Sequence, residues 1–148
     1  MVRRFWEATC RGAYAGHGET YMHPKDILWW SHGGELHGES PLQLSFLRRI
    51  LNETPGLGLA PMKGRADEIV AKVDQLFDRA DYYLYYYNIM RPSFREFRFN
   101  DDNEYQVEVI DTWEMTIEDR GCFKGKFRVE LPGKEYMAIR IRKVNFSD

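Results

Sequence analysis

The residues whose types could do chemistry gather between residues 13 and 40, in the segment AYAGHGETYMHPKDILWWSHGGELHGES. The side chains that we expect to contact a ligand are His17, Glu19, Trp29, Trp30 and His32. Aromatic rings stack on the C–H faces of a sugar, while carboxylates and imidazoles bind its hydroxyl groups. Glycine is dense here, as it is where a backbone turns sharply or lies close to a ligand. The segment therefore predicts a long functional loop that binds a polyhydroxylated ligand.

A carboxylate pair within this segment would be the alternative to simple binding. Glu19 with Glu35 or Glu39 could act as acid and nucleophile if their carboxyl groups lay about 5–5.5 Å apart, or about 6.5–9.5 Å apart for inversion. Nothing in a glycine-rich loop enforces either separation. Glu39 also precedes a helix, where the helix dipole alone favours a carboxylate. We therefore expect no catalytic residue in this chain.

The four histidines are a second alternative, as ligands of a metal. Their spacings match no structural zinc pattern, and no cysteine accompanies them. We expect contacts with sugar or solvent instead, with no metal and no cofactor. Trp29 and Trp30 could also be core residues. In an extended segment their rings would point to opposite faces, which would leave one ring available to a ligand.

Composition narrows the class of protein. The chain has 148 residues, 43% of them hydrophobic, and a net charge of −2, which suits one domain or a small domain with an appendage. The charges are interspersed, which argues against a nucleic-acid partner. No apolar run is long enough to span a membrane, and no signal peptide is recognisable. Cys10 and Cys122 are far apart and are expected to be unpaired thiols, so a cytoplasmic location is expected.

Two helices and a short strand are predicted to surround the glycine-rich segment. Apolar residues at helical spacing predict a helix over residues 2–11, with Gly12 as its C-terminal cap. Residues 13–16 are small and apolar, which predicts a buried strand. Ser40 as N-cap, Pro41 and Gln43 predict the start of a second helix, with a capping box between Ser40 and Gln43. Residues 56–65 are interpreted as a linker, and residues 66–80 as a helix rather than a strand.

The rest of the chain alternates with a period of two. Apolar residues alternate with polar ones over residues 97–99, 105–109, 113–117, 127–131 and 137–141. Residues 82–87 are aromatic on both faces and predict a central strand; a ligand platform is the alternative. Turns are expected at residues 100–103, where calcium binding is the alternative, and at residues 118–121. The predicted fold is α+β and mainly β, an antiparallel β-sandwich preceded by two helices and the glycine-rich loop.

Five segments in order carry a resemblance to a known group of proteins: RRFWEATCRGAYAGHGETY, LWWSHGGELHGESP, YYLYYYNIMRPSF, EVIDTWEMTI and FRVELPGKEYMAIRI. Together they resemble the C-terminal part of bacterial glycoside hydrolases described as β-xylosidase or apiosidase-like. The resemblance implies that the full-length proteins of this group consist of an N-terminal β-sandwich, a (β/α)₈ barrel and a C-terminal β-sandwich of unknown function. Residues 1–55 would be the last helix–strand–helix of the barrel, residues 56–65 a linker, and residues 66–148 the C-terminal sandwich.

The resemblance also implies what this chain lacks. Barrel glycosidases place their catalytic carboxylates after earlier strands, which would lie upstream of Met1. We therefore expect a fragment, a truncated reading frame or one piece of a split enzyme, which supports the barrel and lends it part of a sugar site but is inactive alone. The alternatives are a stand-alone carbohydrate-binding module and a structural module. The expected partners are a carbohydrate and either a second copy of this chain or the missing barrel. The protein partner is expected because the apolar face of the first predicted helix, with Phe5 and Trp6, must be covered. The alternative is that this helix packs onto the sandwich of its own chain.

Overall fold

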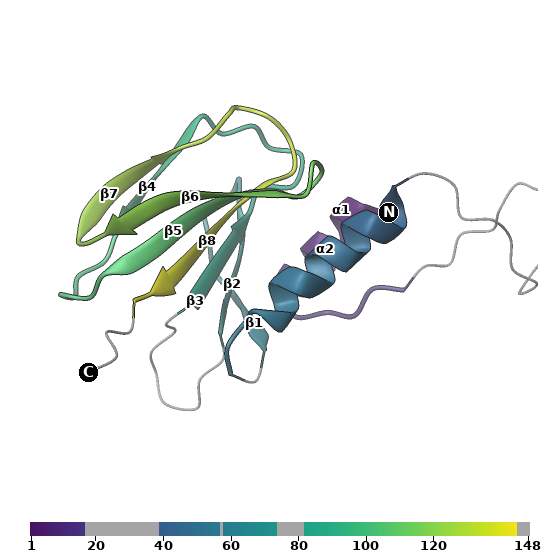
Figure 1. Cartoon of the computed structure of the whole chain (residues 1–148), viewed down its shortest axis with the longest axis horizontal. Coiled ribbons are helices and arrows are strands. Elements are labelled where there is room, and N and C mark those ends of the chain that lie inside the picture. Colours follow the sequence, from purple (N-terminus) through teal and green to yellow (C-terminus); the bar gives the residue numbers. More distant parts are fainter. Residues whose placement is uncertain (17–38, 57, 74–81, 145–148) are drawn as a thin grey trace, which may run out of the picture.

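The computed structural model describes residues 1–16, 39–56, 58–73 and 82–144 (Figure 1). These residues form two helices followed by antiparallel strands. The predicted fold class, α+β and mainly β with a sandwich, is confirmed. The elements are α1 (Val2–Cys10), α2 (Ser40–Asn52), β1 (Leu59–Met62), β2 (Ile69–Val73), β3 (Tyr82–Tyr86), β4 (Phe94–Arg98), β5 (Tyr105–Asp111), β6 (Thr116–Phe123), β7 (Lys126–Glu130) and β8 (Met137–Lys143).

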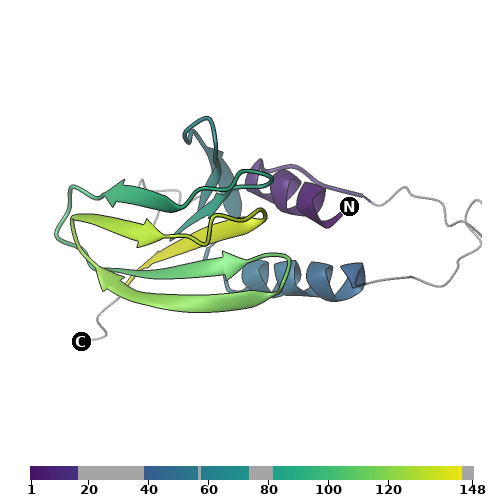
Figure 2. The same ribbon diagram turned by 90° about the horizontal axis from the view of Figure 1, so that it is seen from above.

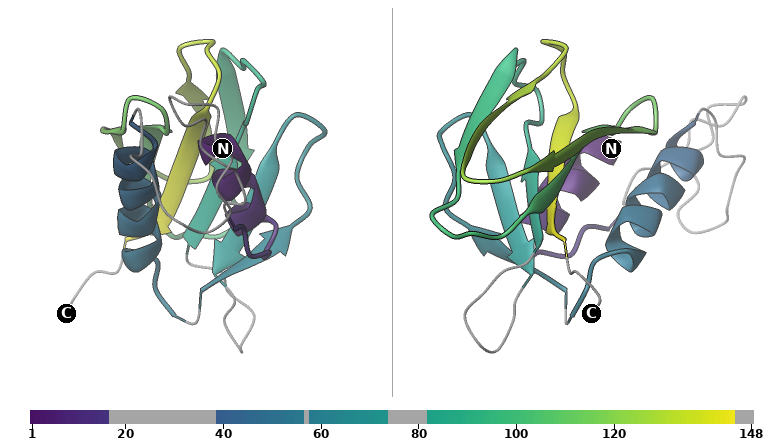
Figure 3. Two further views of the ribbon diagram at one scale, coloured as in Figure 1. Left: turned by 90° about the vertical axis from the view of Figure 1, so that its right-hand side faces the viewer. Right: turned by 60° about the vertical axis from the view of Figure 1, so that its left-hand side comes forward.

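The strands form two sheets, and the helices add a third layer. The larger sheet has the order β1-β2-β3-β8-β5-β6, and β4 pairs with β7 in a separate two-stranded sheet. All pairs are antiparallel. Figure 1 shows β4 and β7 on one side of the larger sheet and both helices on the other, and the left view of Figure 3 looks onto that helical side. The larger sheet is therefore covered on both faces.

Strand β3 shows why the sequence produces a sheet of this kind. Tyr82, Leu84 and Tyr86 belong to the core beneath the helices. Tyr85 and Tyr87, on the opposite face, belong to the core beneath β4 and β7. Since alternate side chains of a strand point to opposite faces, an aromatic run without polar breaks suits a strand buried on both sides. The prediction of a central strand is confirmed.

Helix α1 packs onto the larger sheet within the same chain. Trp6 is fully buried, with its ring centroid 5.6 Å from that of Tyr86 on β3 and 6.4 Å from that of Phe46 on α2. Phe5 packs against the same core. The apolar face of α1 thus lies against the sandwich, which was one of the two outcomes expected for it.

Helix α1 ends as its sequence predicts. Gly12 has a positive φ of 69°, the left-handed conformation that glycine adopts most readily. The N–H of Gly12 donates to the carbonyl of Thr9, and the N–H of Ala13 donates to the carbonyl of Ala8. These are the two hydrogen bonds of a Schellman motif, so the predicted cap is confirmed.

Three predictions about the first part of the chain are wrong. Residues 13–16 form no strand and are exposed. The capping box does not form: Glu39 is the N-cap, and Gln43 hydrogen-bonds elsewhere. The preference for a helix over residues 66–80 is contradicted by β2, where Ile69–Val73 is rich in β-branched residues and pairs with β3. Residues 74–80 lie outside the described residues.

Two predicted turns also differ from the structure. Residues 100–103 connect β4 to β5, which lie in different sheets, so they cross between layers and do not close a hairpin. Residues 118–121 are part of β6, which continues to Phe123. A bulge opposite Val107 and Glu108, with Gly121 at a φ of 87°, lets the pairing run through this region. The real turn between β5 and β6 lies at residues 112–115.

The two cysteines differ in their surroundings. Cys10 is fully buried on α1, while Cys122 is exposed on β6, and the two are unpaired as expected. Burial raises the pKa of the Cys10 thiol from 9.0 to about 12, an effect that the nearby Arg11 reduces. The protonated thiol is therefore favoured in the folded protein.

This difference predicts the reactivity of the thiols. At about pH 8 a disulfide reagent should modify Cys122 in the native protein and Cys10 only after unfolding, because the thiolate is the nucleophile and must be accessible. The stability that the neutral Cys10 contributes should be present below pH 9.0 and decrease as the pH rises toward 12. The difference in reactivity is measured by following the reaction of the disulfide reagent over time, with and without denaturant. Equal rates for both native thiols would contradict it.

Candidate functional site

All five residues that the sequence suggested for sugar binding lie outside the described residues. They are His17, Glu19, Trp29, Trp30 and His32, and they belong to the segment between α1 and α2. The described chain stops at Gly16 and resumes at Glu39, the N-cap of α2. The surface next to the start of α2 is therefore the described surface that is nearest in the chain to the predicted loop.

Two stacked aromatic rings lie at this place. Trp113, in the turn between β5 and β6, stacks on Tyr136 with ring centroids 5.0 Å apart and an interplanar angle of 26°. The Trp113 side chain is 46% exposed, which is unusual for so large an apolar group. Gln43, in the first turn of α2, donates a hydrogen bond of 3.1 Å to the carbonyl of Trp113. We call Trp113 and Tyr136 the aromatic shelf; Figure 2 shows the turn between β5 and β6 reaching over α2.

Short polar side chains shape the turn that carries Trp113. Asp111 Oδ1 accepts hydrogen bonds from the backbone N–H groups of Trp113 (3.0 Å) and Glu114 (2.9 Å). The hydroxyl of Thr112 donates to the carbonyl of Tyr136 at 2.7 Å, which joins the two halves of the shelf. Tyr136 itself has a positive φ of 62°, a conformation that is rare outside glycine. The shelf is therefore held by specific contacts on both sides.

Charged groups surround a cavity of about 310 Å³ beside the shelf. Arg91 pairs with Glu135 at 2.6 Å, and Lys134 pairs with Asp111. The hydrogen bond from Arg91 lowers the pKa of Glu135, and the hydrogen bond to Asp111 raises the pKa of Lys134. The residues that line the cavity are Arg91, Asp111, Trp113, Glu114, Gly133, Lys134, Glu135 and Tyr136.

This arrangement suits binding better than catalysis. An aromatic face beside charged donors and acceptors can hold a sugar ring by stacking and by hydrogen bonds to its hydroxyls. Glu135, with its lowered pKa, stays ionised near neutral pH and is unsuited to be a general acid. Within the described ranges, no three His, Cys, Asp or Glu side chains come together as metal ligands.

Sequence reasoning missed this site. The alternation of Trp113, Met115 and Ile117 with polar residues predicts a strand, whereas Trp113 lies in the turn between β5 and β6. The signal that could have found the turn is Asp111 followed by Thr112, because such side chains hydrogen-bond the backbone two residues on. Tyr136 carried no signal of its own, since its position depends on pairing between distant strands.

The two sheets and the helical layer define a mainly β domain of the α+β class, and comparison with known proteins identifies its family. The chain belongs to the family described as Domain of unknown function (DUF5605), whose model matches residues 69–142. A search of curated proteins found no match. Among the described residues, no helix combines the length and apolar character needed to cross a bilayer.

One solved structure contains a similar fold as part of a larger protein. A protein of Bacteroides vulgatus ATCC 8482 named as a putative glycoside hydrolase matches with a TM-score of 0.72 and 25% identity, over 92% of this chain and 30% of that protein. A structure named only "Glycoside hydrolase" has a TM-score of 0.49 and 15% identity, over 68% of this chain and 24% of its own. A family 5 glycoside hydrolase of the same Bacteroides strain has a TM-score of 0.47 and 14% identity, over 68% of this chain and 23% of that protein. The present chain thus spans less than a third of each of these proteins.

Proposed function

We propose that this chain is the C-terminal accessory region of a glycoside hydrolase with β-xylosidase-like specificity, which supports the catalytic barrel and contributes to its sugar site. The observation that carries this proposal is the match of 92% of the chain, at a TM-score of 0.72, to 30% of the Bacteroides vulgatus protein. A chain that corresponds to under a third of a hydrolase and matches it nearly throughout is best explained as one part of such an enzyme.

The aromatic shelf supports the sugar-binding part of the proposal. It lies beside the first turn of α2, through the hydrogen bond from Gln43 to Trp113. Gln43 follows Glu39 by four residues, and the predicted sugar-binding loop joins the helix at Glu39. In this proposal the loop residues and the shelf bind neighbouring parts of one oligosaccharide.

Two exposed apolar side chains support contact with a barrel. Tyr14, after α1, is fully exposed, and Leu42, in the first turn of α2, is 62% exposed. In the sequence, Tyr14 precedes and Leu42 follows the five residues predicted to bind sugar. Large exposed apolar groups of this kind commonly mark interaction sites. In the proposed enzyme they pack against the barrel, whose loops supply the catalytic carboxylates.

Replacement of Trp113 tests the proposal. Titration of the chain with xylo-oligosaccharides should show binding by calorimetry, and Trp113→Ala should weaken it about tenfold, equivalent to about 1.4 kcal/mol. The loss follows from removal of the stacking face, while the fold should persist because Trp113 is half-exposed. Phe94→Ala is the matched control, since Phe94 is 41% exposed on β4 and belongs to a different sheet.

Two results would contradict the proposal. Xylo-oligosaccharide binding that is absent, or unchanged in Trp113→Ala, would remove the sugar-binding role and favour a purely structural module. Turnover of an aryl xyloside by this chain alone, abolished by Glu19→Gln, would show that catalysis does not lie in a separate part.

A stand-alone carbohydrate-binding module is the second candidate. It is favoured because this chain itself supplies the stacked rings of Trp113 and Tyr136 and the charged residues of the cavity beside them. Addition of a barrel from a related hydrolase distinguishes the two functions. The accessory role requires a stable complex with the barrel, whereas a stand-alone module binds sugar equally well without it.

A further inference from the structure

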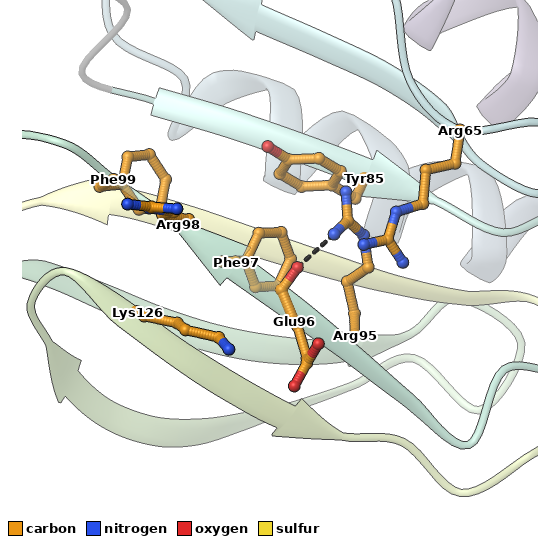
Figure 4. A pocket seen from close by; sticks show the side chains of 8 residues that line it. All are labelled: Arg65, Tyr85, Arg95, Glu96, Phe97, Arg98, Phe99 and Lys126. Atoms are coloured by element: carbon orange, nitrogen blue, oxygen red, sulfur yellow. Dashed lines mark hydrogen bonds between the residues drawn. The ribbon is translucent and has the colours of Figure 1, made fainter.

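A second cavity opens between the two sheets of the sandwich, and it is strongly basic. Its volume is about 330 Å³. Four cationic side chains reach it, Arg65, Arg95, Arg98 and Lys126, and Glu96 is the acidic residue that lines it (Figure 4). We call this cavity the basic pocket. The protein as a whole has a net charge of −2, so this concentration of positive charge is a local feature.

The topology explains why the pocket is open. Strand β4 pairs with β7 along one edge, and within the described chain no strand pairs with its other edge. Tyr85 comes from β3 of the larger sheet, and Arg65 comes from the segment that precedes β2. Arg98 comes from β4 in the smaller sheet. The pocket therefore lies where the larger sheet continues past the smaller one.

A buried carboxylate fixes the geometry of the pocket. The side chain of Glu68 is 1% exposed and accepts hydrogen bonds from Arg95 Nε at 2.8 Å and Arg95 Nη2 at 3.0 Å. The same carboxylate accepts the backbone N–H of Arg65 at 2.9 Å. Glu68 thus balances the charge of Arg95 and anchors the backbone of Arg65. A forked pair of this kind holds a guanidinium in one orientation.

Aromatic rings form the apolar part of the pocket. Tyr85, Phe97 and Phe99 line it, and the guanidinium carbon of Arg95 lies 4.8 Å from the ring centroid of Phe97 and 5.7 Å from that of Tyr85. Figure 4 shows the side chains of Arg65 and Arg95 extending toward the same part of the pocket, beside Tyr85. Rings next to planar cations offer a ligand both an apolar face and charged donors.

The remaining cations are available to a ligand. Arg95 is balanced by Glu68, but no carboxylate of the described residues forms an ion pair with Arg65, Arg98 or Lys126. All three residues are exposed. Three cations opposed by the single carboxylate of Glu96 leave an excess of positive charge, which attracts an anion.

We propose that the basic pocket binds the carboxylate of a uronic-acid unit in an acidic oligosaccharide. Arginine guanidiniums bind a planar carboxylate through paired hydrogen bonds, and Arg65 and Arg98 each offer one guanidinium, at opposite ends of the pocket (Figure 4). Tyr85 and Phe97 are buried, so the partly exposed ring of Phe99 is the one that can face the C–H surface of the sugar. The volume of about 330 Å³ is at the lower end of the range of ligand sites and suits a single sugar unit. That the ligand is a carbohydrate rests on the proposed function; that it is anionic rests on the pocket itself.

Titration with a uronic-acid trisaccharide tests this inference, with its methyl ester as the neutral ligand and sodium sulfate as a simple anion. The wild-type chain should bind the acid at least tenfold more tightly than the ester, and added salt should weaken this binding. Arg65→Gln and Arg98→Gln should each weaken binding of the acid about tenfold. Arg128→Gln is the matched control, because Arg128 lies on β7, is half-exposed and pairs with Glu130 outside the pocket.

The outcomes separate this inference from the proposed function. Equal affinity for acid and ester, or unchanged affinity in Arg65→Gln and Arg98→Gln, would overturn the basic pocket as a uronate site. Sulfate binding as tight as that of the trisaccharide would show a general anion site and would also overturn it. Xylo-oligosaccharide binding tests the aromatic shelf separately, since it should depend on Trp113 and be indifferent to Arg98. Circular dichroism of each variant verifies that the fold is retained.

Discussion

Replacement of Arg140 by alanine should lower the free energy of unfolding by about 3 kcal/mol. Arg140 lies on β8, and its side chain is 2% exposed on the sheet face that the helices cover. Its Nε donates to Glu108 Oε2 at 2.6 Å, and its Nη1 pairs with Glu53 Oε2 at 2.5 Å. Burial alone lowers the pKa of Arg140, but its hydrogen bonds to Glu108 and Glu53 raise it above the usual value, so the guanidinium stays charged.

The size of this effect depends on what the substitution leaves behind. Removal of one partner of a buried ion pair costs about 3–5 kcal/mol, because the other charge stays buried without compensation. Glu108 would keep one partner, since Arg142 Nη2 lies 3.1 Å from Glu108 Oε1. Arg142 is about a third exposed and compensates only in part, which places the expected loss at the lower end of that range.

Chemical denaturation measures the loss, and two further variants interpret it. Arg128→Ala removes an exposed pair with Glu130 and should change stability by less than about 1 kcal/mol. The double variant with Glu108→Leu and Arg140→Leu should recover most of the stability, because it leaves no buried charge unpaired. A loss for Arg140→Ala no greater than that for Arg128→Ala would show that the buried network does not stabilise the fold.

Arg140 also shows how far the sequence could predict the fold. The alternation of Met137, Ile139 and Ile141 with polar neighbours predicted β8 correctly. The same alternation placed Arg140 on a solvated face, and that interpretation is wrong because α1 and α2 cover it. A period of two identifies the faces of a strand but does not say what covers the polar one. A signal did exist: Glu108 is the direct cross-strand partner of Arg140.

The candidate sites were less predictable than the strands. The sequence drew attention to the segment with Trp29 and Trp30, which lies outside the described residues, so its role in sugar binding stays a prediction. Trp113 became a candidate only when the fold placed it beside Tyr136, which is distant in sequence. Arg65, in the segment before β2, and Arg98, on β4, likewise line one pocket although they are distant in sequence. Local patterns identify elements, whereas sites depend on which elements become neighbours.

Replacement of Trp6 by alanine should have the largest effect, a loss of about 3–5 kcal/mol of stability. Trp6 is fully buried where α1, α2 and β3 meet, and its ring contacts those of Phe46 and Tyr86. A cavity at this junction removes contacts from three elements at once. For a chain of this length the melting temperature should fall by about 10 °C, measurable by circular dichroism. Tyr14→Ala is the control and should change stability little, because Tyr14 is fully exposed.

Trp6→Ala also separates the proposed xylo-oligosaccharide site, with its loop and aromatic shelf, from the basic pocket. Trp6 holds α1 against α2 and the sheet, so it fixes both ends of the predicted sugar-binding loop. In Trp6→Ala, studied well below its melting temperature, xylo-oligosaccharide binding should weaken. Uronate binding should persist, because the basic pocket is built by β3, β4, β7 and the segment before β2 without either helix. Equal loss of xylo-oligosaccharide binding and uronate binding in a folded variant would show that the two sites are not independent.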